Sequence, residues 1–311
     1  MHQATHRVDK RTGEHYCTVL PPCALPSPAK LNSTTAFERF RAIQNLSSGD
    51  HGLALLIHIP TSDQSLPDAY PDALISEAGL LGKHLTDKPE LQLLHVYGDA
   101  GQFSSQQLQQ LFTVLRQHLQ LPTNNFAWFS IEIQPDTSSW AALGMLRDAG
   151  FNRITLHSNA SCFQATESLY EAARTLQYNT ITMALALPDN SAASDIHTQR
   201  LQSIIGLQPD RILLQGAGTA PVHLCESLLH AGYVQASSHC FVLPDDELLE
   251  NSCHSCVENC RTRHFSVLGL GAGASSQLTG LYYRNDDNLT TYIQALVNKQ
   301  LPPARGYREI A

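Results

Sequence analysis

The chain lacks any long apolar run. No stretch of its 311 residues approaches the ~20 apolar residues that a membrane helix needs. The N-terminal sequence MHQATHRVDKRTGEHY contains no apolar signal core. We therefore predict no membrane span and a cytoplasmic location. In that compartment the eight cysteines should stay reduced unless they bind a metal.

Charge is also scarce, at 15% of residues against roughly 25% in ordinary soluble domains. The 28 acidic residues outnumber the 20 basic ones, which gives a net charge of -8. No patch of basic side chains interleaved with aromatic ones occurs, and this argues against a nucleic-acid partner. The sequence contains neither the HExxH motif of zinc proteases nor the GxSxG motif of serine hydrolases.

The strongest positive feature is an alternation of apolar runs and amphipathic windows. Leu53 to Ile59 is an apolar run interrupted only by His58, as in a buried parallel strand. The pattern predicts further strands over 91–97, 126–133, 152–157, 179–187 and 210–215. It predicts helices over 36–45, with Thr34 or Thr35 as the cap, and over 70–86, 105–120, 138–149, 163–177, 195–206, 221–231 and 286–298. This order indicates a parallel sheet with right-handed crossovers, either an open doubly wound sheet or a partial barrel.

Seven short segments of the sequence distinguish between these two architectures. They are IHIP (57–60), SIEIQPDT (130–137), GFNRIT (150–155), LALP (185–188), LQPDRI (207–212), HCFVLPDDEL (239–248) and LGLGAGASS (268–276). In this order they resemble the oxygen-independent coproporphyrinogen III oxidases of the radical S-adenosylmethionine superfamily. The resemblance extends from about Tyr16 to Tyr307. It implies an α/β fold with a partial (βα)6 parallel barrel over 51–235. An N-terminal arm and short helix over 1–50 would precede the barrel, and a C-terminal extension of the barrel would follow over 236–311.

The resemblance also implies a ligand pocket at the carboxyl ends of the strands, where parallel barrels hold their active sites. Glu132 and Arg153 are then remnants of a polar cofactor pocket. The other implied pocket residues are Tyr16 in a proline-rich arm, His58, Gly98, Gly101 and Gly271. A structural interpretation remains open, in which Glu132 and Arg153 support the fold and His58, His95 and His157 are packed histidines.

The family's iron–sulfur motif is missing. Its CxxxCxxC cysteines fall on Ser62, Leu66 and Ala69, and none of these side chains is a thiol. The family's GGGTP turn reads Tyr97-Gly98-Asp99-Ala100-Gly101, and Asp99 brings a carboxylate toward the expected carboxylate of the cofactor. We therefore expect S-adenosylmethionine to bind weakly. We also expect no counterpart of the family's C-terminal domain.

The chain contains one run of cysteines that is not part of the family's motif. Cys253, Cys256 and Cys260 would share one face of a helix, with His254 or His264 as a possible fourth ligand. Thiolates favour zinc, copper(I) or an iron–sulfur cluster. Thiols without a defined role are the alternative. Cys17, Cys23 and Cys240 are further candidates from elsewhere in the chain.

Three functional hypotheses follow. The first is a catalytically altered or inactive paralogue, more a pseudoenzyme than an enzyme. It would bind a porphyrin or haem-like ligand as a carrier, regulator or accessory protein of tetrapyrrole metabolism. The second is an active coproporphyrinogen III oxidase-like oxidoreductase that uses a cluster on Cys253, Cys256 and Cys260. The third is a metal-free scaffold that binds a partner protein.

Overall fold

The computed structural model describes residues 32–46, 52–61, 66–86, 88–121, 128–158, 163–187, 195–216, 220–250, 266–278 and 280–308. Its strands are β1 (Asn32–Ser33), β2 (Leu53–Ile59), β3 (Leu91–Gly98), β4 (Trp128–Ile133), β5 (Arg153–Ser158), β6 (Thr180–Ala186), β7 (Arg211–Gln215), β8 (Val234–Gln235), β9 (Cys240–Val242), β10 (Ser266–Leu270), β11 (Ser275–Leu278), β12 (Leu281–Asn285) and β13 (Ala304–Arg308). Its helices are α1 (Ala36–Gln44), α2 (Tyr70–Gly82), α3 (Ser105–His118), α4 (Trp140–Asp148), α5 (Phe163–Thr175), α6 (Asp195–Leu207), α7 (Val222–His230), α8 (Glu247–Glu250) and α10 (Leu289–Val297).

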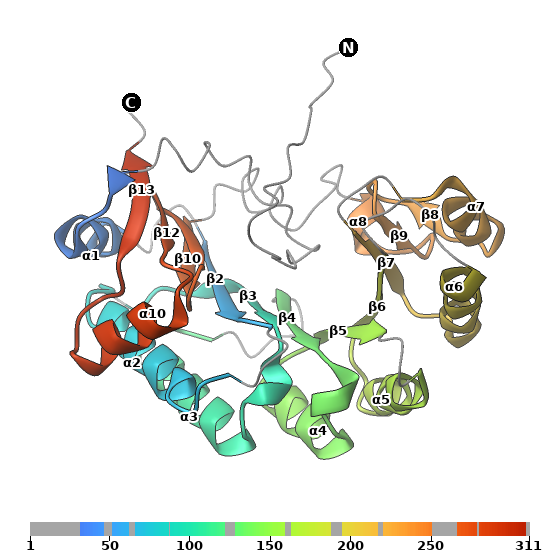
Figure 1. Cartoon of the computed structure of the whole chain (residues 1–311), viewed down its shortest axis with the longest axis horizontal. Helices are drawn as coiled ribbons and strands as arrows, with labels where there is room; N and C mark the ends of the chain where they lie inside the picture. Colours follow the sequence, from blue (N-terminus) through green and yellow to red (C-terminus); the bar gives the residue numbers. More distant parts are fainter. Residues whose placement is uncertain are drawn as a thin grey trace, which may run out of the picture.

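The strands form one open, curved sheet in the order β1-β13-β12-β11-β10-β2-β3-β4-β5-β6-β7-β9-β8. Strands β2 to β7 are parallel to one another, and helices α2 to α7 lie along the outer side of the arc (Figure 1). This arrangement confirms the predicted partial (βα)6 barrel. The six predicted strands match β2 to β7 within a few residues. The predicted helix over 70–86 already ends at Gly82.

Alternation along the strands separates two environments. Successive side chains of a strand point to opposite faces. In β2, Leu53, Leu55 and Ile57 belong to the main core against the helices, whereas Ala54 and Leu56 belong to a small separate cluster on the concave face. The continuous apolar run of β2 therefore reflects burial on both faces.

The C-terminal residues return to the beginning of the barrel. Strand β10 pairs in parallel with β2, and β11, β12 and β13 continue the sheet beyond it in antiparallel order. Strand β13 then pairs with β1 from the N-terminal arm. At the opposite edge, β9 pairs with β7 and β8. Residues 236–311 thus contribute to both ends of the sheet, and their separation from 51–235 stays a prediction.

Within the part of the chain that the structure describes, no helix combines the length and the apolar character needed to cross a membrane.

Candidate functional site

The concave face of the sheet is polar, in contrast to the apolar face under the helices. Most of its polar side chains are buried. They include His95, Ser130, Glu132, Arg153, Thr155, Thr180, Thr182 and Arg211, with His58, Tyr97 and His157 partly exposed near the carboxyl ends of the strands. Since parallel strands end at one rim, this rim is where a ligand would enter.

Glu132 is the centre of a buried cluster at the rim. One carboxylate oxygen lies 3.6 Å from His95 Nε2 and the other lies 3.4 Å from His157 Nε2. The Gly98 N–H also donates to this carboxylate, at 3.1 Å. Burial alone would raise the pKa of Glu132, but the hydrogen bonds and charges of His157 and His95 hold it well below its usual value. Glu132 is therefore ionised at neutral pH.

The imidazole of His95 is fixed from both sides, because its Nδ1 lies 2.7 Å from Ser130 Oγ. Tyr97 stacks between two histidines, with ring centroids 4.7 Å from His58 and 5.8 Å from His95. His58 Nδ1 donates to the carbonyl of Ala272, at 2.6 Å, which joins β2 to the turn after β10. The rim thus presents the partly exposed rings of His58 and Tyr97, next to the buried pair of His95 and Glu132.

The N–H groups of the turn after β3 donate to acceptors within the protein and not to solvent. Five of its N–H groups donate hydrogen bonds to acceptors inside the protein: those of Gly98, Asp99, Gly101, Gln102 and Phe103. Asp99 is 5% exposed, and its Oδ1 accepts from Gly101 N and from Thr137 Oγ1. This turn therefore directs its donors toward Glu132, Asp99 and nearby backbone carbonyls and not toward a ligand.

None of the positions matched to the family's cluster cysteines, Ser62, Leu66 and Ala69, carries a thiol. Leu66 is 8% exposed, and its N–H donates to Gln102 Oε1 at 2.9 Å. Ala69 is the residue that precedes α2. Ser62, Tyr16 and the cysteines Cys253, Cys256 and Cys260 lie outside the described residues. Among the residues that are described, no group of three histidine, cysteine or acidic side chains is arranged to hold a metal ion.

Two of the predicted pocket glycines lie where a side chain would collide with neighbouring atoms. Gly271 has φ +107, and a Cβ there would lie 2.3 Å from the His58 carbonyl oxygen. The Gly271 N–H donates to the buried Glu77, at 2.7 Å. A Cβ on Gly101 would lie 2.1 Å from Thr137 Oγ1. Cys240, proposed as an additional thiol ligand, is half-buried on β9, and desolvation raises its pKa to about 12.

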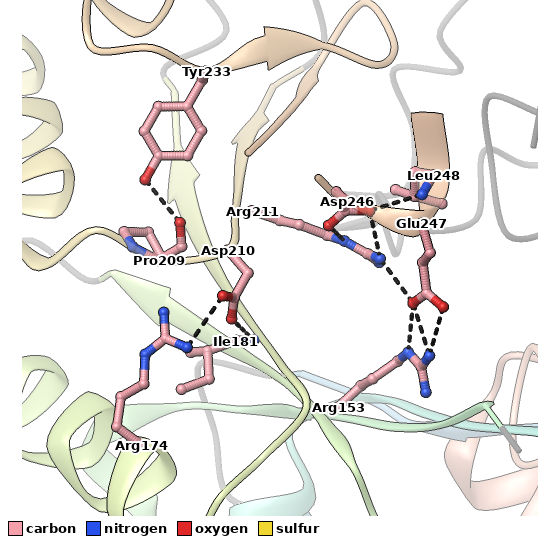
Figure 2. Close-up of polar contacts among 10 residues, drawn as sticks. All are labelled: Arg153, Arg174, Ile181, Pro209, Asp210, Arg211, Tyr233, Asp246, Glu247 and Leu248. Carbon is pink, nitrogen blue, oxygen red and sulfur yellow. Dashed lines mark hydrogen bonds and ion pairs between the residues drawn. The ribbon is translucent and has the colours of Figure 1, made fainter. Parts of the chain in front are cut away.

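Arg153 lies at the other end of the concave face, at the start of β5. Its guanidinium pairs with Glu247 at 2.7 Å and packs 4.2 Å from the ring centre of Trp128. Arg211, at the start of β7, pairs with Asp246 at 2.6 Å and also reaches Glu247 at 3.1 Å. Figure 2 shows both guanidiniums converging on Asp246 and Glu247, at the start of α8. The structure therefore joins Arg153 to Glu247 and not to Glu132.

This arginine network connects three of the segments that carry the family resemblance. GFNRIT supplies Arg153, HCFVLPDDEL supplies Asp246 and Glu247, and LQPDRI supplies Asp210 and Arg211. Asp210 in turn accepts from Arg174 at 3.1 Å and from the Ile181 N–H at 2.7 Å (Figure 2). These segments therefore build the framework at the amino ends of the strands.

The sequence predicted Glu132 and His58 in one pocket but did not predict the pairing of Glu132 with two histidines. The available signal was strand parity, since positions 95, 97, 130 and 132 share one face if β3 and β4 pair in that register. It also missed Glu77, which sits in an ordinary helical window and gives no local signal.

Comparison with known proteins finds similar enzymes and a similar solved structure. No protein-family profile matches the chain. It is 28% identical to the oxygen-independent coproporphyrinogen III oxidase of Pseudomonas aeruginosa, over 87% of this chain and 71% of that protein. The enzyme of the same name from Salmonella typhimurium is 24% identical over 86% of this chain and 70% of its own length. The structure of coproporphyrinogen III oxidase (HemN) from Escherichia coli, described as a radical SAM enzyme, superposes with a TM-score of 0.73 at 19% identity, over 92% of this chain and 78% of that one.

Proposed function

Because the chain belongs to the family of the oxygen-independent coproporphyrinogen III oxidases, we propose that it is a cytoplasmic tetrapyrrole-binding protein that has lost the family's radical chemistry. It would bind a porphyrin or haem-like ligand in the barrel mouth and act as a carrier, regulator or accessory protein. A partner protein that receives or delivers the ligand is part of this proposal.

The observation that carries the proposal is the donor set where the family holds its cluster. Iron–sulfur clusters are held by cysteine thiolates. Here Leu66 turns a buried apolar side chain into the protein, and Ala69 has no ligating atom. The residues present do not fit a cluster at this position, so we derive no reaction step through one.

The turn after β3 supports the same conclusion for the second cofactor. In the family this turn brings its backbone to the methionyl group of S-adenosylmethionine. In this chain the Gly98 N–H is bound to the ionised Glu132 and Asp99 occupies the inside of the turn. A ligand carboxylate here would meet two carboxylates in place of free amide hydrogens.

The rest of the barrel is retained, which argues for a binding role. The arginine network keeps the amino ends of the strands together, and the partly exposed rings of His58 and Tyr97 lie at the mouth. Contact between these aromatic side chains and a planar macrocycle would bury apolar area on both.

The test is titration of the anaerobically purified protein with haem and with metal-free protoporphyrin IX, followed by the Soret band. We expect dissociation constants in the micromolar range or below and no consumption of coproporphyrinogen III. Tyr97→Leu should weaken binding about tenfold because it removes the central ring. Phe37→Leu is the matched control, since this ring lies 72% exposed on α1, outside the barrel. Absence of binding at micromolar concentration would contradict the proposal.

The same preparation tests the oxidoreductase hypothesis. If Cys253, Cys256 and Cys260 hold a replacement cluster, anaerobic reconstitution should give a brown protein with iron and sulfide in equal amounts. Serine substitutions at Cys253 and Cys256 should then abolish both. Zinc in place of iron would make the cysteine run a structural site, and coproporphyrinogen consumption by the brown protein would replace our proposal.

A further inference from the structure

Glu77 on α2 is a buried carboxyl group that receives hydrogen bonds from three donors on three other parts of the fold. The Gly271 N–H, in the turn after β10, and the Tyr292 hydroxyl, on α10, both donate to its Oε2 at 2.7 Å. Asn285 Nδ2, at the end of β12, donates to its Oε1 at 2.7 Å. An ionised carboxylate accepts all three of these bonds, and hydrogen bonds to a charged acceptor are the stronger kind.

The protonated carboxyl group needs a different arrangement, because its own O–H must donate to an acceptor. The backbone N–H of Gly271 can only donate. The Tyr292 hydroxyl can accept if its proton turns away, and Asn285 can accept if its amide turns over. Asn285 Oδ1 is buried and meets no donor within the part of the chain that the structure describes. Each protonation state of Glu77 therefore has its own hydrogen-bond pattern, and the bond from Gly271 loses its charged acceptor when the proton binds.

The turn after β10 connects this carboxyl group to the mouth. Asn285 Nδ2 also donates to the Gly271 carbonyl, at 3.0 Å. At the next residue, the Ala272 N–H donates to Tyr70 Oη at 3.2 Å, and the Ala272 carbonyl accepts from His58 Nδ1 at 2.6 Å. Tyr70 Oη in turn donates to the His58 carbonyl, at 2.8 Å. A displacement of this turn therefore reaches the partly exposed ring of His58.

The titratable groups around Glu77 leave it as the group that exchanges a proton near neutral pH. Burial raises the pKa of Tyr283, on β12, to about 12 and holds the pKa of Tyr70 and of Tyr292 well above its usual value. Arg39, on α1, is 3% exposed and supplies a positive charge that acts on Glu77. The three phenols therefore keep their protons at neutral pH and the guanidinium keeps its charge. Burial raises the pKa of Glu77 itself to about 7.

We propose that Glu77 is a proton-operated switch for the mouth, which holds the turn after β10 firmly when ionised and releases it, together with His58, when a proton binds. Glu77 is a positioning residue in this proposal, because it acts through the turn. The protonated state is the more stable one for the whole fold, since it avoids a buried charge, but it holds the turn by weaker bonds. The inference goes beyond tetrapyrrole binding, because it concerns the protein without a ligand.

The test follows the amide signals of Gly271 and Ala272 by NMR of the full-length, ligand-free protein as the pH rises from about 5.5 to about 8.5. We expect the Gly271 amide proton to shift downfield with a midpoint near pH 7, because its acceptor becomes charged. The Ala272 amide should shift with the same midpoint. Glu77→Gln cannot ionise and should lose this step at both amides. Steps that remain in the variant come from His58, which bonds to the same turn.

Hydrogen exchange of the same two amides measures how firmly the turn is held. After correction for the intrinsic exchange rate, protection in the wild-type protein should be about tenfold lower at about pH 6 than at about pH 8. In Glu77→Gln the protection should be the same at both values.

Glu38→Gln is the matched control, because Glu38 is a partly exposed carboxylate on α1 that accepts from the Thr35 N–H at 2.9 Å. The hydrogen bonds from Thr35 lower the pKa of Glu38 below 4.5, so this group stays ionised over the whole range of the titration. The substitution should leave the signals of Gly271 and Ala272 unchanged.

Tyr292→Phe is a second variant that does not depend on the folding of Glu77→Gln. It removes one of the hydrogen bonds that lower the pKa of Glu77, so the midpoint at Gly271 should rise by about one pH unit. An unchanged midpoint would overturn the assignment of the step to Glu77.

The remaining outcomes are equally decisive. A step that persists in Glu77→Gln, or no step at Gly271 in the wild-type protein, would overturn the switch. A step at Gly271 without one at Ala272 would show that the proton binds but does not reach the mouth, which also contradicts the proposal. None of these measurements requires a tetrapyrrole, so the switch and the proposed function fail independently.

Discussion

Gly98 shows how a single residue shapes the mouth. Its φ is +99, which side chains other than glycine rarely adopt, and a Cβ would lie 1.8 Å from the Ile59 carbonyl oxygen. The close approach lets its N–H reach Glu132. The conformation therefore connects strand β2, the turn after β3 and the buried carboxylate.

We expect Gly98→Ala to lower the free energy of unfolding by about 3 kcal/mol, since the backbone must move to relieve both strain and contact. Urea denaturation followed by circular dichroism measures this. Gly144→Ala is the control. This glycine lies inside α4 with no atom within 4 Å of the added Cβ, and alanine should stabilise the helix by about 1 kcal/mol. Equal effects of the two substitutions would refute the close approach at Gly98.

At the scale of elements, Glu77 holds α2 to the C-terminal strands. Its carboxylate accepts from the Gly271 N–H, from Asn285 Nδ2 and from Tyr292 Oη, each at 2.7 Å. Complete burial raises its pKa to about 7, against the lowering effect of these hydrogen bonds and of Arg39. The folded protein thus retains a proton that the unfolded chain releases near pH 4.5.

This pKa predicts how stability changes with pH. A carboxyl group with a raised pKa in the folded state contributes its full stability below about pH 4.5 and loses it as the pH rises through about 7. The loss should be about 3 kcal/mol relative to Glu77→Gln, which cannot ionise. Urea denaturation of both proteins between pH 4.5 and 8 measures the difference. A difference that does not change over this range would contradict the raised pKa.

A second contact between elements is the Arg211–Asp246 pair, which joins β7 to the turn before α8. Both side chains are nearly inaccessible, at 6% and 5% exposure. Arg211→Met should cost about 3 kcal/mol because it leaves a buried carboxylate unpaired, and adding Asp246→Leu should recover at least half of that loss. Arg174→Met, from the more exposed pair with Asp210, should cost about 1 kcal/mol. A double-mutant cycle in urea checks both values.

At the scale of the whole molecule, the C-terminal strands and the barrel share one sheet. Strand β10 pairs with β2 along its full length, and α10 reaches α2 through Tyr292 and Glu77. We expect the amides of β2, β10 and β12 to exchange hydrogen only on global unfolding, with equal free energies of opening. Hydrogen exchange with mass spectrometry measures these values. Earlier exchange of β10 and β12 would show a separate C-terminal unit.

Local patterns determined much of this protein by themselves. Apolar runs such as Leu53–Ile59 specify strands, amphipathic windows specify the covering helices, and their alternation specifies parallel pairing. Single residues were predictable where the chemistry is local, as with Thr35, which caps α1 through a hydrogen bond from the Glu38 N–H. The loss of the family's cysteines at positions 62, 66 and 69 was equally a matter of sequence.

Only the tertiary structure decided which distant groups meet. Arg153 and Glu247 are 94 positions apart, and Glu77 and Gly271 are 194 apart. Neither contact follows from periodicity, because both depend on how far the sheet curves and on which strand the returning C-terminal chain joins. The same holds for Glu132, whose place between His95 and His157 requires the register of three strands. Periodicity alone predicts which face of the sheet each side chain lies on. The curvature and register of the sheet decide which side chains form contacts.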